Sequence, residues 1–197
     1  MVELGTPFWA SDFSTGRAGL PRRVDVVVVG GGITGVGLAR RLVRDGVSVM
    51  VAERSVPGSG ATGRNAGFLL TGVAANYASA TRQYGRSRAA EIWQFTLENH
   101  RLMAAAVGRG DAGYRRRGSW VLPASSEERE QLLESVTLLA EDGLPGEWRD
   151  DAPASGGGPP GGLLNPADGE LQPARALAAV AAMLPPGVVF EGLEVVG

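Results

Sequence analysis

Three glycines and one acidic residue carry the clearest chemical signal in the sequence. Gly30, Gly32 and Gly35 have the spacing G-x-G-x-x-G, and Glu53 follows them. Between a strand and a helix, such glycines allow a tight turn, a close approach of the backbone to a pyrophosphate, and close packing of the helix on the strand. The free N–H groups at the start of that helix attract phosphate, and the acidic side chain can bind both ribose hydroxyls. The pattern predicts a dinucleotide-binding site.

The segments around these glycines have the order of elements that such a site requires. Residues 26–29 are four consecutive valines, which is typical of a strand buried on both faces. Apolar residues three and four apart predict a helix from Ile33 that ends at Gly46. Residues 47–51 alternate as a second strand, which ends at Glu53. Because glycine makes up 30 of the 197 residues, the glycine pattern alone is weak evidence, and this context gives it weight.

A loop rich in Gly and Ser follows the second strand, where an NAD domain would normally have another helix. Glu53 would repel a 2′-phosphate, which argues against NADP, although the adjacent Arg54 favours it. Residues 55–72 can run along an extended cofactor and supply N–H groups, hydroxyl groups and one cation to a pyrophosphate. The candidate cofactor-binding residues are Gly30, Gly32, Ile33, Thr34, Gly35, Glu53, Arg54, Ser59, Ala61, Thr62, Arg64, Asn65, Ala66 and Gly67.

The other residues that could do chemistry have simpler interpretations. His100 is the single histidine and lies on the apolar face of a helix predicted over 77–107, where a structural histidine is more common than a catalytic base. Residues 115–117 are three arginines that could bind an anion, but their alternation along a strand favours an exposed strand edge. With no Cys and one His, the sequence offers no credible metal site. We assign no catalytic residue.

Composition restricts the class of protein. A length of 197 residues allows one large domain or two small ones, and 44% hydrophobic residues suffice for a core. The net charge of −2 gives no reason to expect a nucleic acid as partner. Two arginines at 22–23 precede the valine run, but no cleavage region follows, so we reject an export signal. Without a targeting or transmembrane segment, we expect a cytoplasmic protein.

The second half of the chain contains further predicted elements. Residues 125–128 form a capping box at the start of an amphipathic helix. Residues 150–162 are too rich in Gly and Pro to form an element, so we expect a flexible loop there. Pro173 is well placed in the first turn of a helix that runs to about Leu184. Residues 188–196 then have the composition of a strand.

These motifs resemble a known family. VVVVGGGITGVGLARRL…GVSVMVAER and GSGATGRNAG are similar to the N-terminal part of the D-amino-acid oxidase superfamily of FAD-dependent oxidoreductases. That group includes the glycine, sarcosine and gamma-glutamylputrescine oxidases. Two later stretches, YRRRGSWVLPASSEEREQLL and NPADGELQPARALAAVA, fit the same family in the same order.

The resemblance implies an α/β fold with two parts. Residues 1–75 and 165–197 would form an incomplete Rossmann-like FAD-binding βαβ domain, and residues 76–164 would form part of an α+β substrate-binding domain. It also implies an enzyme that oxidises the C–N bond of a small amine or amino acid by hydride transfer to flavin N5. Oxygen or a quinone would then accept the electrons.

The loop and the length of the chain qualify that implication. Some relatives attach FAD through a His in the loop that matches residues 58–67; Arg64 and Asn65 stand there in this chain, so we expect non-covalent FAD. Relatives continue beyond Gly197, so we expect an N-terminal fragment whose catalytic residues lie elsewhere. Two alternatives remain open, an NAD-dependent dehydrogenase and a catalytically incomplete FAD-binding fragment. The sequence does not specify the substrate, the electron acceptor or the oligomeric state.

Overall fold

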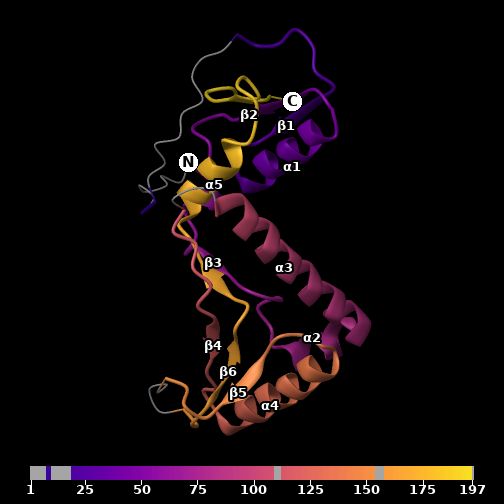
Figure 1. Cartoon of the computed structure of the whole chain (residues 1–197), viewed down its shortest axis with the longest axis vertical. Coiled ribbons are helices and arrows are strands. Elements are labelled where there is room, and N and C mark those ends of the chain that lie inside the picture. The colour runs from indigo at the N-terminus through magenta and orange to yellow at the C-terminus, as the bar shows by residue number, and fades with distance from the viewer. Residues whose placement is uncertain (1–7, 10–18, 109–111, 154–157, 197) are drawn as a thin grey trace. The chain divides into compact units, whose positions relative to one another are not determined.

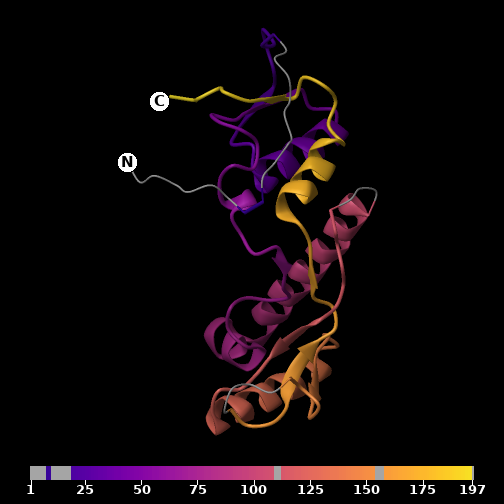
Figure 2. The same cartoon turned by 90° about the vertical axis from the view of Figure 1, so that its left-hand side faces the viewer.

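The chain forms two compact units, each built from separate stretches of sequence. A computed structural model describes residues 8–9, 19–108, 112–153 and 158–196. The first unit comprises residues 1–67, 105–114 and 171–197, and the second comprises residues 68–104 and 115–170. Figure 1 and Figure 2 show their elements in two views. The division into domains predicted from the sequence remains a prediction.

The first unit contains a parallel sheet of three strands. Its strands are β1 (Val26–Val29), β2 (Val49–Ala52) and β8 (Val189–Phe190), in the order β1-β2-β8. Val26 pairs with Val49, and Val51 pairs with Val189, so β2 lies between the other two strands. The helix α1 (Ile33–Arg44) connects β1 to β2. This order of elements confirms the predicted Rossmann-like βαβ unit.

Two helices pack together in the first unit, and their apolar faces form its core. The helix α5 (Pro173–Ala181) lies beside α1 in both Figure 1 and Figure 2. Val36 of α1 and Leu177 of α5 are completely buried in one cluster, and Val51 is completely buried in the neighbouring cluster of the sheet. Val27 and Val29 are 47% and 66% exposed, because alternate residues of β1 point away from this core. The prediction that this strand is buried on both faces is therefore wrong.

The ends of α5 and β8 differ from the sequence prediction. The helix begins at Pro173 as predicted but ends at Ala181 rather than near Leu184. The N–H of Leu184 bonds to the carbonyl of Ala181, three residues earlier, so the last turn is tighter than an α-helix. The strand has only two residues instead of nearly the whole of 188–196.

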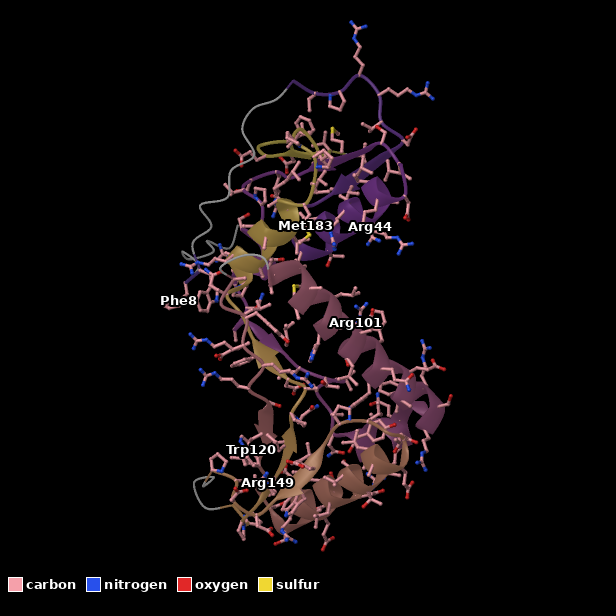
Figure 3. The ribbon with its side chains drawn as sticks, viewed as in Figure 1. Phe8, Arg44, Arg101, Trp120, Arg149 and Met183 are labelled. Atoms are coloured by element: carbon pink, nitrogen blue, oxygen red, sulfur yellow. The ribbon has the colours of Figure 1, made fainter. Side chains whose placement is uncertain are left out.

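The second unit combines three helices with two antiparallel sheets. The helices are α2 (Tyr77–Tyr84), most of α3 (Arg86–Val107) and α4 (Ser126–Glu141). One sheet has the order β4-β6-β5, with β4 (Ser119–Val121), β5 (Glu147–Arg149) and β6 (Gly162–Asn165). The other pairs β3 (Phe68–Leu69) with β7 (Gly169–Glu170). Figure 3 labels Trp120 on β4 and Arg149 on β5.

Two predicted features of the second unit can be compared with the structure. The helix predicted over 77–107 is divided at Gly85, whose φ of +82° suits glycine and ends α2. At the start of α4 the Ser125 hydroxyl accepts a hydrogen bond from the Glu128 N–H at 3.2 Å, as a capping box requires, while the Glu128 carboxylate accepts one from the N–H of Ala124 at 2.7 Å. Part of the loop predicted over 150–162, residues 154–157, lies outside the described residues. In the part of the chain that the structure describes, no helix has the length and apolarity to cross a membrane.

Candidate dinucleotide-binding site

The turn between β1 and α1 brings the start of the helix against the end of the strand. Gly30 has a φ of +105°, a conformation that side chains disfavour. Its N–H donates to the carbonyl of Ala52 at 2.8 Å, which fixes the turn to the end of β2. A Cβ on Gly35 would overlap the carbonyl oxygen of Gly30 and lie 3.2 Å from a methyl group of Val28. The turn therefore depends on glycine at both positions.

The first turn of α1 presents N–H groups that could bind an anion. Among the described residues, none accepts a hydrogen bond from the N–H of Gly32, Thr34 or Gly35. The N–H of Ile33 donates to the hydroxyl of Thr62 at 3.0 Å, so the following loop is fixed to the helix at this point. A helix N-terminus with free N–H groups carries partial positive charge and binds phosphate readily.

A shallow groove opens beside this helix N-terminus. Its volume is about 520 Å³. Predicted site residues form one part of its lining, namely Gly30, Gly32, Ile33, Thr34, Gly35 and Thr62. The valines of β1 and Leu38 of α1 form the rest. The groove thus joins the polar backbone of the turn to an apolar wall, which suits a ligand with a charged linkage and a flat ring.

Glu53 lies at the end of β2 and is held by two backbone groups. Its Oε2 accepts a hydrogen bond from the N–H of Gly31 at 2.8 Å, and its Oε1 accepts one from the N–H of Ser55 at 2.8 Å. An ionised carboxylate has about four acceptor positions, so two of them stay available for hydroxyl groups. The two hydrogen bonds fix the carboxylate beside the glycine turn before any ligand arrives.

Gly31 is a residue of the site that the sequence analysis did not single out. A Cβ at this position would lie 3.0 Å from the Cβ of Glu53, so a larger residue would displace the carboxylate. Its N–H holds Glu53, and its carbonyl accepts a hydrogen bond from Gly58 at 3.1 Å. The signal was present in the sequence, because the variable position between Gly30 and Gly32 is itself glycine.

The loop after β2 is stabilised largely by its own polar groups. It contains a short 3-10 helix, η1 (Ala61–Gly63). The Asn65 amide donates to the carbonyls of Ala61 and Thr62 at 3.1 and 2.7 Å and accepts from the N–H of Gly67 at 2.8 Å. The indole N–H of Trp9 donates to the Asn65 carbonyl at 2.9 Å. Asn65 therefore shapes the loop in this structure.

Glu53 and the predicted loop residues other than Thr62 are not part of the groove's lining. Arg54, Ala61 and Ala66 are exposed. The Nε of Arg64 donates to the carbonyl of Ser59 at 2.8 Å, across the loop. A Cβ on Gly67 would overlap the carbonyl oxygen of Leu171, so the end of the loop packs closely on the chain leading to α5. The structure thus gathers the glycine turn, Thr62 and Glu53, and it uses the other loop residues in the loop itself.

His100 and the three arginines belong to the second unit. His100 is 6% exposed, and its Nδ1 lies 3.3 Å from the carbonyl oxygen of Ala167. This is the environment of a buried structural histidine. Arg116 donates to the carbonyl of Pro166 at 3.1 Å, and Arg117 lies 3.8 Å from the Glu170 carboxylate. These arginines have partners within their own unit.

Comparison with known proteins identifies similar chains. The gamma-glutamylputrescine oxidoreductase of Escherichia coli (strain K12) is 34% identical over 99 residues, which are 49% of this chain and 23% of that protein. The 4-methylaminobutanoate oxidase (formaldehyde-forming) of Paenarthrobacter nicotinovorans is 28% identical over 176 residues, 85% of this chain and 20% of that protein. A high-resolution structure of L-amino acid deaminase from Proteus vulgaris with its specific insertion sequence deleted superimposes with a TM-score of 0.67 at 21% identity, covering 91% of this chain and 47% of that one.

The chain spans less than half the length of each of these relatives. The sequence profile of the family DAO, described as FAD dependent oxidoreductase, matches residues 25–197, which is nearly the whole chain. The match includes the glycine turn, Glu53 and the loop after β2. It confirms the resemblance stated from the sequence and selects a flavin over NAD as the family's cofactor. The chain belongs to the DAO family of FAD-dependent oxidoreductases.

Proposed function

We propose that the first unit binds the adenosine and pyrophosphate part of FAD without a covalent bond. Two features of the described residues carry this proposal: N–H groups without an acceptor at the start of α1, and the carboxylate of Glu53, which the N–H groups of Gly31 and Ser55 hold. The N–H groups of Gly32, Thr34 and Gly35 would hold the pyrophosphate. The two free acceptor positions of Glu53 would hold the ribose hydroxyls.

The glycines of the turn fit this role because they leave the helix N-terminus open. Gly32 carries no side chain that could block the approach of a phosphate. The Thr62 hydroxyl, which now accepts from Ile33, would stand beside the pyrophosphate and could donate its own proton to it. Non-covalent binding is supported by the loop residues 58–67, which include neither His nor Cys.

We further propose that the protein takes part in oxidising the C–N bond of a small amine or amino acid. The relatives' names support this class, since they include an oxidoreductase of gamma-glutamylputrescine and an oxidase of 4-methylaminobutanoate. Bound FAD supplies the acceptor for the hydride, at flavin N5. The residues of this chain would bind and orient the cofactor, and oxygen or a quinone would reoxidise it. Localisation in the cytoplasm remains a prediction.

The binding proposal can be tested with ligands that separate the two ends of FAD. Isothermal titration of the 197-residue chain should give binding of FAD and ADP, because both carry the adenosine and pyrophosphate. FMN lacks the adenosine and should not bind. Binding of FMN without ADP would overturn the assignment. Denaturation should release any flavin that copurifies into the supernatant, whereas a covalent flavin would precipitate with the protein.

Glu53→Gln tests the role of the carboxylate. The substitution keeps the size of the side chain but removes its charge and one of the two oxygens that accept hydrogen bonds from Gly31 and Ser55. We expect the dissociation constants for ADP and FAD to rise about 5- to 150-fold, from the loss of a charged hydrogen bond of ~1–3 kcal/mol. The matched control is Glu91→Gln on α3, whose carboxylate pairs with Arg88 on the surface of the second unit. Equal affinities in both variants would refute the ribose assignment.

Activity is a separate question from binding. If the chain binds FAD and consumes oxygen or reduces a quinone analogue when supplied with small amines, the oxidation proposal is supported. If it binds FAD but oxidises no amine, the alternative of a catalytically incomplete FAD-binding fragment holds for this chain.

A further inference from the structure

A pocket in the second unit combines an apolar lining with one buried carboxylate. It has a volume of about 190 Å³ and lies among β4, β6, α3, α4 and the chain leading into α2. Its apolar lining includes Trp93, Leu132 and Leu163. Its rim includes Leu70 and Val121, which are 53% and 46% exposed, so the pocket opens to solvent between apolar side chains.

The carboxylate is that of Asp168, which is 3% exposed. Its Oδ1 accepts two hydrogen bonds from Thr71, from the N–H at 2.9 Å and from the hydroxyl at 2.6 Å. Its Oδ2 accepts one hydrogen bond, from the Ser119 hydroxyl at 2.6 Å. A carboxylate has about four acceptor positions, so one position remains, on Oδ2. The three donors are neutral and leave the charge of the group uncompensated.

Within the described residues, no cation balances this charge. Among the residues that the structure describes, Asp168 forms no ion pair with Lys, Arg or His. The described residues that line the pocket include no Lys, Arg or His. Buried charges in proteins are normally paired, because an isolated charge away from water is costly. The pocket therefore favours a positively charged ligand.

The size and lining of the pocket define that ligand further. An apolar cavity of about 150 Å³ holds one benzene molecule, so this pocket suits a molecule of roughly six to eight non-hydrogen atoms. An ammonium group could donate to the open position of Asp168 Oδ2, while a short alkyl chain contacts the leucines. The ring of Trp93 would add attraction for the cation.

We propose that this pocket binds a small organic ammonium ion, a primary or secondary amine with a short apolar chain. Asp168 recognises the charge, and the apolar lining recognises the chain. The site lies within the second unit and requires no flavin. The proposal is therefore independent of the proposed FAD site, and the failure of either test leaves the other unaffected.

Three probes of equal chain length test the proposal on the 197-residue chain: n-pentylammonium, 1-pentanol and pentanoate. Titrations followed by the NMR signals of the Trp93 indole N–H and the Thr71 amide should give binding of n-pentylammonium about tenfold or more tighter than 1-pentanol. Pentanoate should cause no shift, because the buried carboxylate repels it. Equal binding of the cation and the alcohol, or no binding of the cation, would overturn the proposal.

Asp168→Asn should abolish the preference for the cation, so that n-pentylammonium and 1-pentanol bind equally. A role of Asp168 in the fold alone would not change the ratio of the two affinities. The matched control is Asp150→Asn, which alters an exposed carboxylate near Trp148 and should keep the preference. A preference that persists in Asp168→Asn would refute the assignment.

A second variant covers the case in which Asp168→Asn does not fold. Val121→Trp places a large ring at the rim and leaves the hydrogen bonds of Asp168 intact. It should weaken n-pentylammonium and 1-pentanol binding alike, by about tenfold or more. Unchanged binding in Val121→Trp would place the ligand elsewhere and overturn the proposal.

Discussion

Gly35 and Gly37 lie close together in α1 and are expected to respond in opposite directions to the same substitution. In Gly35→Ala the new methyl group would overlap the carbonyl oxygen of Gly30, closer than the 3.0 Å that real Cβ atoms keep, and lie 3.2 Å from Val28. In Gly37→Ala the methyl group meets nothing within 4 Å. The pair separates the packing role of glycine from its effect on helix propensity.

The magnitudes follow from these surroundings. Gly37→Ala should stabilise the protein by about 0.5–1 kcal/mol, since alanine is the better helix former. Gly35→Ala gains the same helix propensity but forces α1 away from β1, because the atom nearest to the new methyl group is the backbone oxygen of Gly30, which is rigidly held. Val36 and Ala39 of α1 are completely buried, and their contacts with the core would loosen. Overpacking of this kind costs about 1–3 kcal/mol or more, so we expect a net loss of about 2 kcal/mol.

Thermal unfolding followed by circular dichroism measures both effects. For a chain of this size, 1 kcal/mol changes the melting temperature by about 2–4 °C. Gly37→Ala should therefore melt about 2–4 °C higher than the unmodified chain and Gly35→Ala about 4–8 °C lower. Titration with ADP should show loss of affinity only in Gly35→Ala, because the displaced helix moves its N–H groups. Equal melting temperatures for the two variants would refute the close approach of α1 to the turn.

The remaining predictions concern the second unit. The pKa of Asp142 is lowered by its hydrogen bonds, first from Arg86 and then from Tyr77. A carboxyl group with a lowered pKa stabilises the fold at pH values above its unfolded pKa of about 3.9, and this stabilisation is lost as the pH falls through its folded pKa. Asp142→Asn should thus reduce stability by about 1–2 kcal/mol at pH 7, with a smaller difference from the unmodified chain near pH 2, as measured by urea unfolding. A difference that is the same at both pH values would contradict this. Gly85→Ala should cost about 1–3 kcal/mol through strain alone, because φ is +82° and ψ is 150° while a Cβ would meet nothing within 4 Å.

The elements around the glycine turn could be predicted because each depends on local pattern. Four valines, a helix with apolar residues three and four apart, and an alternating second strand specify β1, α1 and β2 almost residue for residue. Pro173 likewise placed the start of α5 correctly. In each case the residues that define the element are neighbours in sequence.

Features that depend on distant partners were harder to predict. The length of β8 is set by pairing with β2, and the run over 188–196 could not reveal that only Val189 and Phe190 pair. The division of the helix at Gly85 could not be predicted, because glycine also occurs inside helices and only the structure gives the positive φ of this residue.

The candidate site shows the same contrast. Glu53 was identified from its place after the second strand, but its bond to Gly31 arises from a turn whose geometry the sequence does not state. The contact of Asn65 with the cofactor stays a prediction, and the sequence did not reveal that its amide bonds to Ala61 and Thr62 within the loop. The surroundings of Asp168 could not be predicted, because its donors Thr71 and Ser119 come from distant segments of the sequence.

The pairing of β2 with β8 has a consequence for how the protein assembles. Val51 can pair with Val189 only after the whole of the second unit has been synthesised, because that unit lies between them in the sequence. Contacts so far apart in sequence slow folding, because the entropy of closing a long loop is lost before the contact forms. During translation, the second unit can begin to fold while the parallel sheet of the first unit still lacks β8. Until β8 is synthesised, the nascent chain exposes the unpaired edge of β2, and misassembly should begin at that edge.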